Sequence, residues 1–122
     1  MGSTPNVGDE GVKTLAALTA LTELDLDDHI EVSDEGVKSL AVLTALTWLN
    51  LNYTHVVDEG VKALVAFTAL TELHLDSTYV GDEGVKALAT LTALTKLNMN
   101  STKVGDEGLK ELTTLAYCSH QA

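Results

Sequence analysis

The feature that most constrains the fold is an internal repeat of about 24 residues. A motif of the form Val-x-Asp-Glu-Gly-(Val/Leu)-Lys occurs five times, beginning at Val7, Val32, Val56, Val80 and Val104. A second motif, Leu-Thr-x-Leu-x-(Leu/Met), recurs at spacings of 25, 24 and 24 residues and begins at Leu21, Leu46, Leu70 and Leu94. Residues 46–69 and 70–93 are identical at 15 of 24 positions. This similarity predicts a repeat protein in which one small structural unit stacks on the next.

Each unit contains a strand pattern followed by a helix pattern. Leu70, Leu73 and Leu75 alternate with polar residues, as in a half-buried strand. After a turn, four apolar residues predict one buried face of a helix: Val85, Leu88, Ala89 and Leu91. A strand and a helix in every unit favour parallel strands stacked on one side of the molecule with the helices on the other.

The start of each predicted helix carries its own signals. Asp82 is placed to cap its helix, and Glu83 lies in the first turn, where Lys86 can pair with it. Gly84 in the same turn indicates a close approach between neighbouring turns. In the first unit the same pattern predicts a helix from residue 9 to about residue 18.

The segment Leu70–Val80 resembles the eleven-residue segment of leucine-rich repeats, and the resemblance covers nearly the whole chain. It implies an α/β solenoid of about five units, with short parallel strands on the concave face and helices on the convex face. Within that family, Gly84–Ala89 looks like the motif of bacterial GALA-type repeats, although no F-box-like segment is present, and the chain is also similar to the Asp-Glu-Gly-containing repeats of bacterial proteins. Threonines stand where a common leucine-rich repeat has its buried asparagine, namely Thr54, Thr78 and Thr102.

We therefore expect one leucine-rich-repeat domain over residues 1–122. It divides into an N-terminal helix unit, four repeats and a polar tail, with the boundaries 1–20, 21–45, 46–69, 70–93, 94–117 and 118–122. The first full repeat has one extra residue, which predicts a bulge at residues 28–31, where His29 lies.

Composition excludes several classes of function. Acidic residues outnumber basic ones 18 to 7, the formal net charge is −11, and no arginine is present, which argues against nucleic-acid binding. The chain has neither a long apolar run nor a signal-peptide pattern, so we expect no membrane contact and a cytoplasmic location, or a host cytosol if the protein is an injected effector. The single cysteine, Cys118, offers neither a disulfide framework nor metal-binding spacing.

Acidic residues gather in the first full repeat and define an acidic patch: Glu23, Asp25, Asp27, Asp28 and Glu31. Three interpretations are open. The patch could bind a hard cation, although no calcium-loop pattern is present. It could bind a basic partner. The interpretation we favour is that charge on an exposed edge strand deters pairing with other sheets.

The variable strand positions form three rows on the concave face. They read Glu23, Trp48, Glu72, Lys96; then Asp25, Asn50, His74, Asn98; then Asp27, Asn52, Asp76, Asn100. The only tryptophan stands at a position that the pattern expects to be exposed, which is typical of an interface anchor. We expect His74 to be a solvated strand residue. The candidate partner-binding residues are Trp48, Tyr53, Glu72, His74, Asp76, Tyr79 and Lys96.

No catalytic motif is present, so we expect no enzyme activity, cofactor or metal. The predicted function is a protein-interaction module that binds a protein partner through the concave face, as a whole protein or as a segment of a larger one. Four strands give a face of about 300 Å², well below the roughly 800 Å² per partner of a stable interface. The alternative is a weak, salt-sensitive homo-oligomer that stacks head to tail, with Lys96 and Lys103 meeting the acidic patch.

Overall fold

Each repeat of the sequence forms one strand and one helix in the computed structural model, which describes residues 8–15, 17–28, 32–112 and 117–119. The strands are β1 (Glu23–Asp25), β2 (Trp48–Asn50), β3 (Glu72–His74), β4 (Lys96–Asn98) and β5 (Tyr117–Ser119). The helices are α1 (Asp9–Leu15), α2 (Asp34–Ser39), α3 (Asp58–Ala63), α4 (Asp82–Leu88) and α5 (Asp106–Lys110). Short 3₁₀ turns, η1 (Leu40–Val42) and η2 (Leu64–Ala66), extend α2 and α3.

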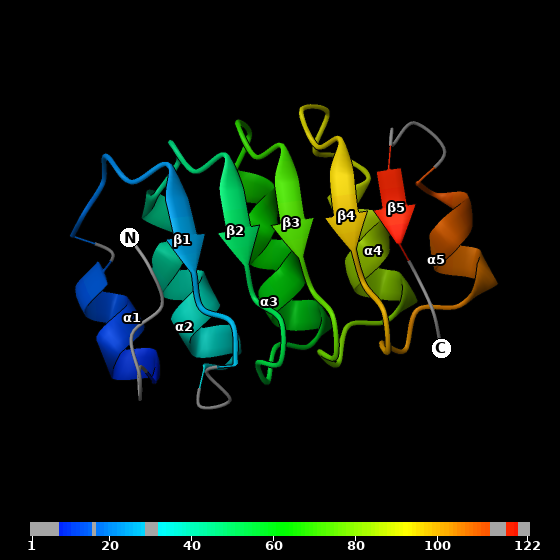
Figure 1. Ribbon diagram of the computed structural model, residues 1–122, viewed down its shortest axis with the longest axis horizontal. Helices are drawn as coiled ribbons and strands as arrows, with labels where there is room; N and C mark the ends of the chain where they lie inside the picture. The colour runs from blue at the N-terminus through cyan, green and yellow to red at the C-terminus, as the bar shows by residue number, and fades with distance from the viewer. Residues whose placement is uncertain (1–7, 16, 29–31, 113–116, 120–122) are drawn as a thin grey trace.

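The strands form one parallel sheet in the order β1-β2-β3-β4-β5, and the helices lie behind it in a second row (Figure 1). A parallel pair needs a crossover connection, and here each crossover between consecutive strands carries a helix. The predicted fold, an α/β solenoid with strands on one face and helices on the other, is confirmed.

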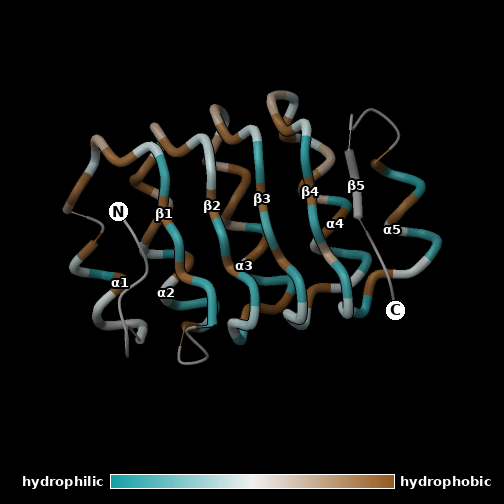
Figure 2. Tube along the Cα trace, in the orientation of Figure 1, coloured by the Kyte–Doolittle hydropathy of each residue, from teal (hydrophilic) through white to brown (hydrophobic). Residues whose placement is uncertain are grey.

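The core lies between the sheet and the helices and consists of apolar positions that recur in every repeat. The central residue of each inner strand is a buried leucine, and the helices contribute buried valines such as Val37, Val61 and Val85. Figure 2 shows the corresponding pattern, with hydrophilic residues along the strands and hydrophobic residues in the segments that lead into them. Burial of each such side chain stabilises the fold by about 1.5–3 kcal/mol.

The fifth strand was not predicted. It pairs with β4 in the register Lys96↔Tyr117, only 21 residues along the chain (117 − 96) instead of 24. Helix α5 has five residues, two fewer than α4. The Leu-Thr-x-Leu signal is absent there, and Cys118 occupies the register position of Leu97. Strand β5 therefore crosses the predicted boundary between the last repeat (94–117) and the polar tail (118–122).

Neighbouring helices are joined by a contact that we call the aspartate–glycine ladder. The Asp58 carboxylate accepts a hydrogen bond of 2.6 Å from the backbone N–H of Gly81 in the next repeat. A Cβ atom on Gly84 would lie 2.7 Å from the same carboxylate oxygen, so the predicted close approach at Gly84 is confirmed. Asp34 and Asp82 make the equivalent contacts one repeat before and after.

The ladder corrects the predicted helix cap. Asp82 is the first residue of α4 and does not cap it, because the N-cap is Gly81 and makes no side-chain cap hydrogen bond. The Asp82 carboxylate accepts a hydrogen bond of 2.7 Å from the N–H of Gly105 instead. A motif that looks local in the sequence therefore acts between repeats.

Three other details of the helices test the predictions. Lys86 pairs with Glu83 at 3.5 Å, as predicted. Helix α4 ends at Leu88, so Ala89 is exposed and does not belong to the buried face. Helix α1 likewise ends at Leu15 rather than near Leu18. In the described part of the chain, no helix is both long and apolar enough to cross a membrane.

After each strand the chain turns sharply toward the helices. Four residues at this turn adopt left-handed backbone angles, with φ between 57° and 64°: Asp28, Tyr53, Ser77 and Ser101. In the last three of these turns the next residue is a threonine, and the Thr78 hydroxyl donates a hydrogen bond of 2.7 Å to the carbonyl of Leu75. Thr54 and Thr102 make the same bond. The predicted bulge lies mainly at residues 29–31, outside the described residues.

Candidate functional site

The exposed side of the sheet, which we call the strand face, carries the predicted rows of variable residues. The sheet register aligns the first row as Glu23, Trp48, Glu72, Lys96 and Tyr117, and the second as Asp25, Asn50, His74, Asn98 and Ser119. Both rows are confirmed, because parallel strands paired without slippage place equivalent repeat positions side by side.

Four of the predicted partner-binding residues meet at the centre of the strand face. Glu72 forms a 2.6 Å hydrogen bond with Nε2 of His74 and an ion pair of 3.7 Å with Lys96. The Trp48 side chain also hydrogen bonds to Glu72, and its ring centroid lies 5.5 Å from that of His74. Trp48, Glu72, His74 and Lys96, together with Asn98, form what we call the central cluster.

The chemistry of the central cluster assigns the histidine protons. An ionised carboxylate only accepts hydrogen bonds, so Nε2 of His74 donates to Glu72. In the neutral ring Nδ1 then accepts from the amide nitrogen of Asn98, at 2.9 Å. The side-chain oxygen of Asn98 is buried and has no partner within the described residues.

The charge of Glu72 is held in place by its neighbours. Burial raises the pKa of Glu72, but hydrogen bonds from His74 and Trp48 and the nearby charges of His74 and Lys96 lower it by more. The net pKa lies below the ordinary value of 4.5. Glu72 is therefore ionised at neutral pH and anchors the three side chains around it.

The structure corrects the predicted exposure of two of these residues. Only 13% of the His74 side chain is exposed and both ring nitrogens are hydrogen bonded, so the expectation of a solvated histidine was wrong. Trp48 is half-buried rather than fully exposed. Diagonal neighbours on adjacent strands are within reach of aromatic side chains, which lets the indole lean onto His74.

The two candidate tyrosines lie at the rim of the strand face, outside the central cluster. Tyr79 is 48% exposed, packs edge-on against His55 at 5.6 Å, and has the Lys103 ammonium 5.7 Å from its ring centre. Tyr53 is 52% exposed and takes a left-handed backbone conformation. Both rings therefore offer apolar surface to solvent.

Asp76 has a structural contact that sequence reasoning missed. Its carboxylate accepts a 2.7 Å hydrogen bond from the backbone N–H of Asn100, and its own N–H donates to the side chain of Asn52 at 2.7 Å. This lateral ladder links the turns that follow β2, β3 and β4. The signal was the recurrence of Asn or Asp at the same position in each of these repeats.

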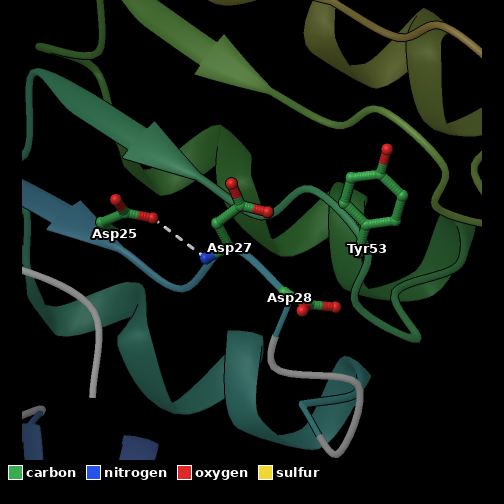
Figure 3. A pocket seen from close by; sticks show the side chains of 4 residues that line it. All are labelled: Asp25, Asp27, Asp28 and Tyr53. Atoms are coloured by element: carbon green, nitrogen blue, oxygen red, sulfur yellow. Dashed lines mark hydrogen bonds between the residues drawn. The ribbon is translucent and has the colours of Figure 1, made fainter. Parts of the chain in front are cut away.

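Part of the acidic patch lines an open hollow of about 490 Å³ (Figure 3). Its walls are Asp25, Asp27, Asp28 and Tyr53, and Asp27 N–H donates to the Asp25 carboxylate at 3.0 Å. Glu23 lies on β1, which pairs only with β2 among the described strands and so forms a sheet edge. Glu31 lies outside the described residues. Although three aspartates line the hollow, no three His, Cys, Asp or Glu side chains in the described ranges are placed so that they could hold one metal ion.

The comparisons with known proteins agree with this architecture. The family model described as "Leucine Rich repeat" matches residues 17–41, 42–65, 68–89 and 90–112. Among the curated proteins, none matches the chain.

Several solved structures are similar in fold. Internalin C2 of Listeria monocytogenes matches with a TM-score of 0.67 and 21% identity over 90% of this chain and 56% of the internalin chain. The tropomodulin C-terminal domain of Caenorhabditis elegans matches with a TM-score of 0.70 and 14% identity, over 95% and 84%. The leiomodin-1 actin-binding site 2 matches with a TM-score of 0.67 and 23% identity, over 93% and 77%. The chain thus spans little more than half of the internalin.

Proposed function

Because the chain belongs to the leucine-rich repeat family, we propose that it is a non-enzymatic module that binds a partner protein through its strand face. The leucine-rich repeat fold is a typical scaffold for protein interaction. Fold alone does not assign a function, so the proposal depends on the residues that this chain places on the sheet.

The central cluster is the observation that carries the proposal. Trp48, the only tryptophan of the chain, lies half-buried on the exposed side of the sheet, where an apolar residue contributes nothing to the core between sheet and helices. Glu72 and His74 hold its ring through a hydrogen bond and a ring contact. A partly fixed indole with charged neighbours resembles the anchors of protein interfaces, because little side-chain entropy is lost when a partner covers it.

The size of the strand face bounds the affinity. The fifth strand raises the sheet area from about 300 to about 400 Å², half of what one partner usually buries in a stable complex. A partner that also covers the rim tyrosines, Tyr53 and Tyr79, would gain further apolar contact. We therefore expect this chain alone to bind weakly, with a dissociation constant in the micromolar range or higher.

Finer assignments are also part of the proposal. The motif Gly84–Ala89 supports a relation to GALA-type repeats, and the single Cys118 is in keeping with a cytosolic location. The name of the leiomodin structure refers to actin binding by that protein, and a likeness at 23% identity supports only the fold.

The proposal can be tested without knowing the natural partner. Peptides selected from a displayed random library against the wild-type chain are titrated against Trp48→Ala and against Val65→Ala, an exposed apolar residue on the helix side. We expect Trp48→Ala to weaken binding by about 2 kcal/mol, or roughly thirtyfold, and Val65→Ala to have no effect. Peptides that bind folded Trp48→Ala as tightly as wild type, but lose affinity for Val65→Ala, would place the binding face on the helices instead.

A further inference from the structure

The two ends of the solenoid each expose one half of the aspartate–glycine ladder. In the interior, the carboxylates of Asp34, Asp58 and Asp82 are half-buried against the next repeat. The equivalent Asp106 is exposed, and its carboxylate makes no hydrogen bond to any described residue. The last helix therefore presents an acceptor whose usual donor is missing from the described chain.

The first helix shows the complementary half. Gly8 and Gly11 correspond to Gly81 and Gly84, which receive the Asp58 carboxylate. The N–H of Gly8 donates no hydrogen bond to any described residue, and Gly11 is half-buried, whereas its four counterparts in α2 to α5 are buried. The first helix thus presents a backbone N–H and a space beside glycine like those that Asp34, Asp58 and Asp82 occupy on the following repeats.

The N-terminal end also exposes apolar residues that belong to the core elsewhere. Leu18 is 44% exposed, while the residues at its repeat position, Leu43, Phe67 and Leu91, are 0%, 0% and 6% exposed. An open hollow of about 420 Å³ is lined by residues 17–21. Strand β1 forms the edge of the sheet at this end (Figure 1).

We propose that this N-terminal end face docks the C-terminal end of a second copy of the chain. The contact would repeat the interior boundaries, with Asp106 of one copy accepting from the N–H of Gly8 and packing on Gly11 of the next. Strand β5 would lie beside β1, and the second copy would cover Leu18. A second copy is the occupant because the two ends of this one chain carry the two halves of a contact that recurs three times among the described residues.

This mode differs from the head-to-tail pairing expected from charge. Lys96 lies on β4, inside the sheet, and pairs with Glu72, while Lys103 lies near the ring of Tyr79. The C-terminal edge of the sheet is β5, beyond both lysines. The ends meet through backbone, carboxylate and apolar contacts rather than through lysine and the acidic patch.

The test uses two variants, each blocking one end. Leu18→Lys places a charge in the apolar hollow, and Asp106→Ala removes the acceptor. Glu107→Ala is the matched control, because it removes the same charge from the same helix turn, where Glu107 pairs with Lys110 of its own helix at 3.3 Å. Mass is measured by sedimentation velocity from about 10 µM to about 1 mM, the range of a weak contact.

We expect the average mass of wild type and of Glu107→Ala to rise with concentration. The mass of each blocked variant should stay near that of a single chain, because its association is weakened at least tenfold. An equimolar mixture of the two blocked variants should form a dimer and grow no further, because each copy keeps one intact end. That result also shows that both variants fold. A single-chain mass for wild type throughout, or association of Asp106→Ala equal to that of Glu107→Ala, would overturn the proposal.

The end contact is independent of the strand face. Trp48→Ala should assemble as wild type does, and the end-blocked variants should bind selected peptides as wild type does. Failure of one proposal therefore leaves the other standing.

Discussion

Replacement of Gly84 by alanine tests how tightly the repeats are stacked. A Cβ atom at this position would lie 2.7 Å from an Asp58 carboxylate oxygen and 2.8 Å from Cγ2 of Val80. Both distances are too short, and the Cβ of Val61 at 3.3 Å leaves little room on the third side. The helix must therefore move away from its neighbour, or the carboxylate must leave its position. Either change breaks the ladder at the boundary between α3 and α4.

The expected loss follows from three contributions. Overpacking of a close contact costs about 1–3 kcal/mol. Displacement of the Asp58 carboxylate weakens its hydrogen bond to the N–H of Gly81, and a bond to a charged group is worth about 1.5–3 kcal/mol. Alanine gains about 1 kcal/mol over glycine within a helix. The net destabilisation is therefore about 1.5–5 kcal/mol.

Gly81→Ala is the matched control in the same repeat. A Cβ there would meet nothing closer than 3.5 Å, and valine and serine stand at the equivalent positions of the two preceding repeats. Its effect should stay within about 0.5 kcal/mol. Free energies of unfolding come from urea titrations followed by far-ultraviolet circular dichroism. If Gly84→Ala proves as stable as Gly81→Ala, the ladder is not a tight contact.

In an Asp58→Ala background the destabilisation caused by Gly84→Ala should be smaller, because the carboxylate no longer occupies the space.

Two further predictions concern side chains with unusual surroundings. The folded-state pKa of Glu72 is lowered, so its ionised form stabilises the fold above pH 4.5. This contribution disappears as the pH falls through the lower folded-state pKa. The difference in unfolding free energy between wild type and Glu72→Gln should therefore shrink in denaturation experiments as pH is lowered from about 7 to about 3, and a difference independent of pH would contradict this. For buried Thr78, replacement by valine removes the hydrogen bond to the Leu75 carbonyl and should cost about 1 kcal/mol in urea denaturation. Thr90→Val removes a similar bond of 2.7 Å at an exposed position and should cost less; equal costs would show that burial of the bond does not matter.

Much of the fold could be predicted from the repeat because spacing and alternation are local properties of the sequence. The strand rows followed from one further condition, that repeats of nearly equal length stack without a shift in register. The strand at residues 117–119 could not be predicted, because it is held by pairing with β4 and not by its own apolar pattern. The role of Asp82 was missed for a related reason, since its partner lies 23 residues away, on the next repeat.

The residues that lie together in the candidate site could be predicted from the sequence, but their contacts and burial could not. Trp48, Glu72, His74 and Lys96 share one region of the strand face, as the rows indicated. The burial of His74 depends on side-chain rotamers and on hydrogen bonds to Glu72 and Asn98, which no sequence pattern specifies. Asp76 looked available for a partner, yet its carboxylate supports a turn of the next repeat.

The most direct test of the proposed function uses the single tryptophan as its own reporter. Trp48 contributes the only indole N–H of the chain, and it lies at the centre of the strand face. In an amide NMR titration with a selected peptide, we expect this signal and the amide signals of β2, β3 and β4 to shift together. Shifts confined to the helices, with the indole signal unchanged at saturation, would contradict binding through the strand face.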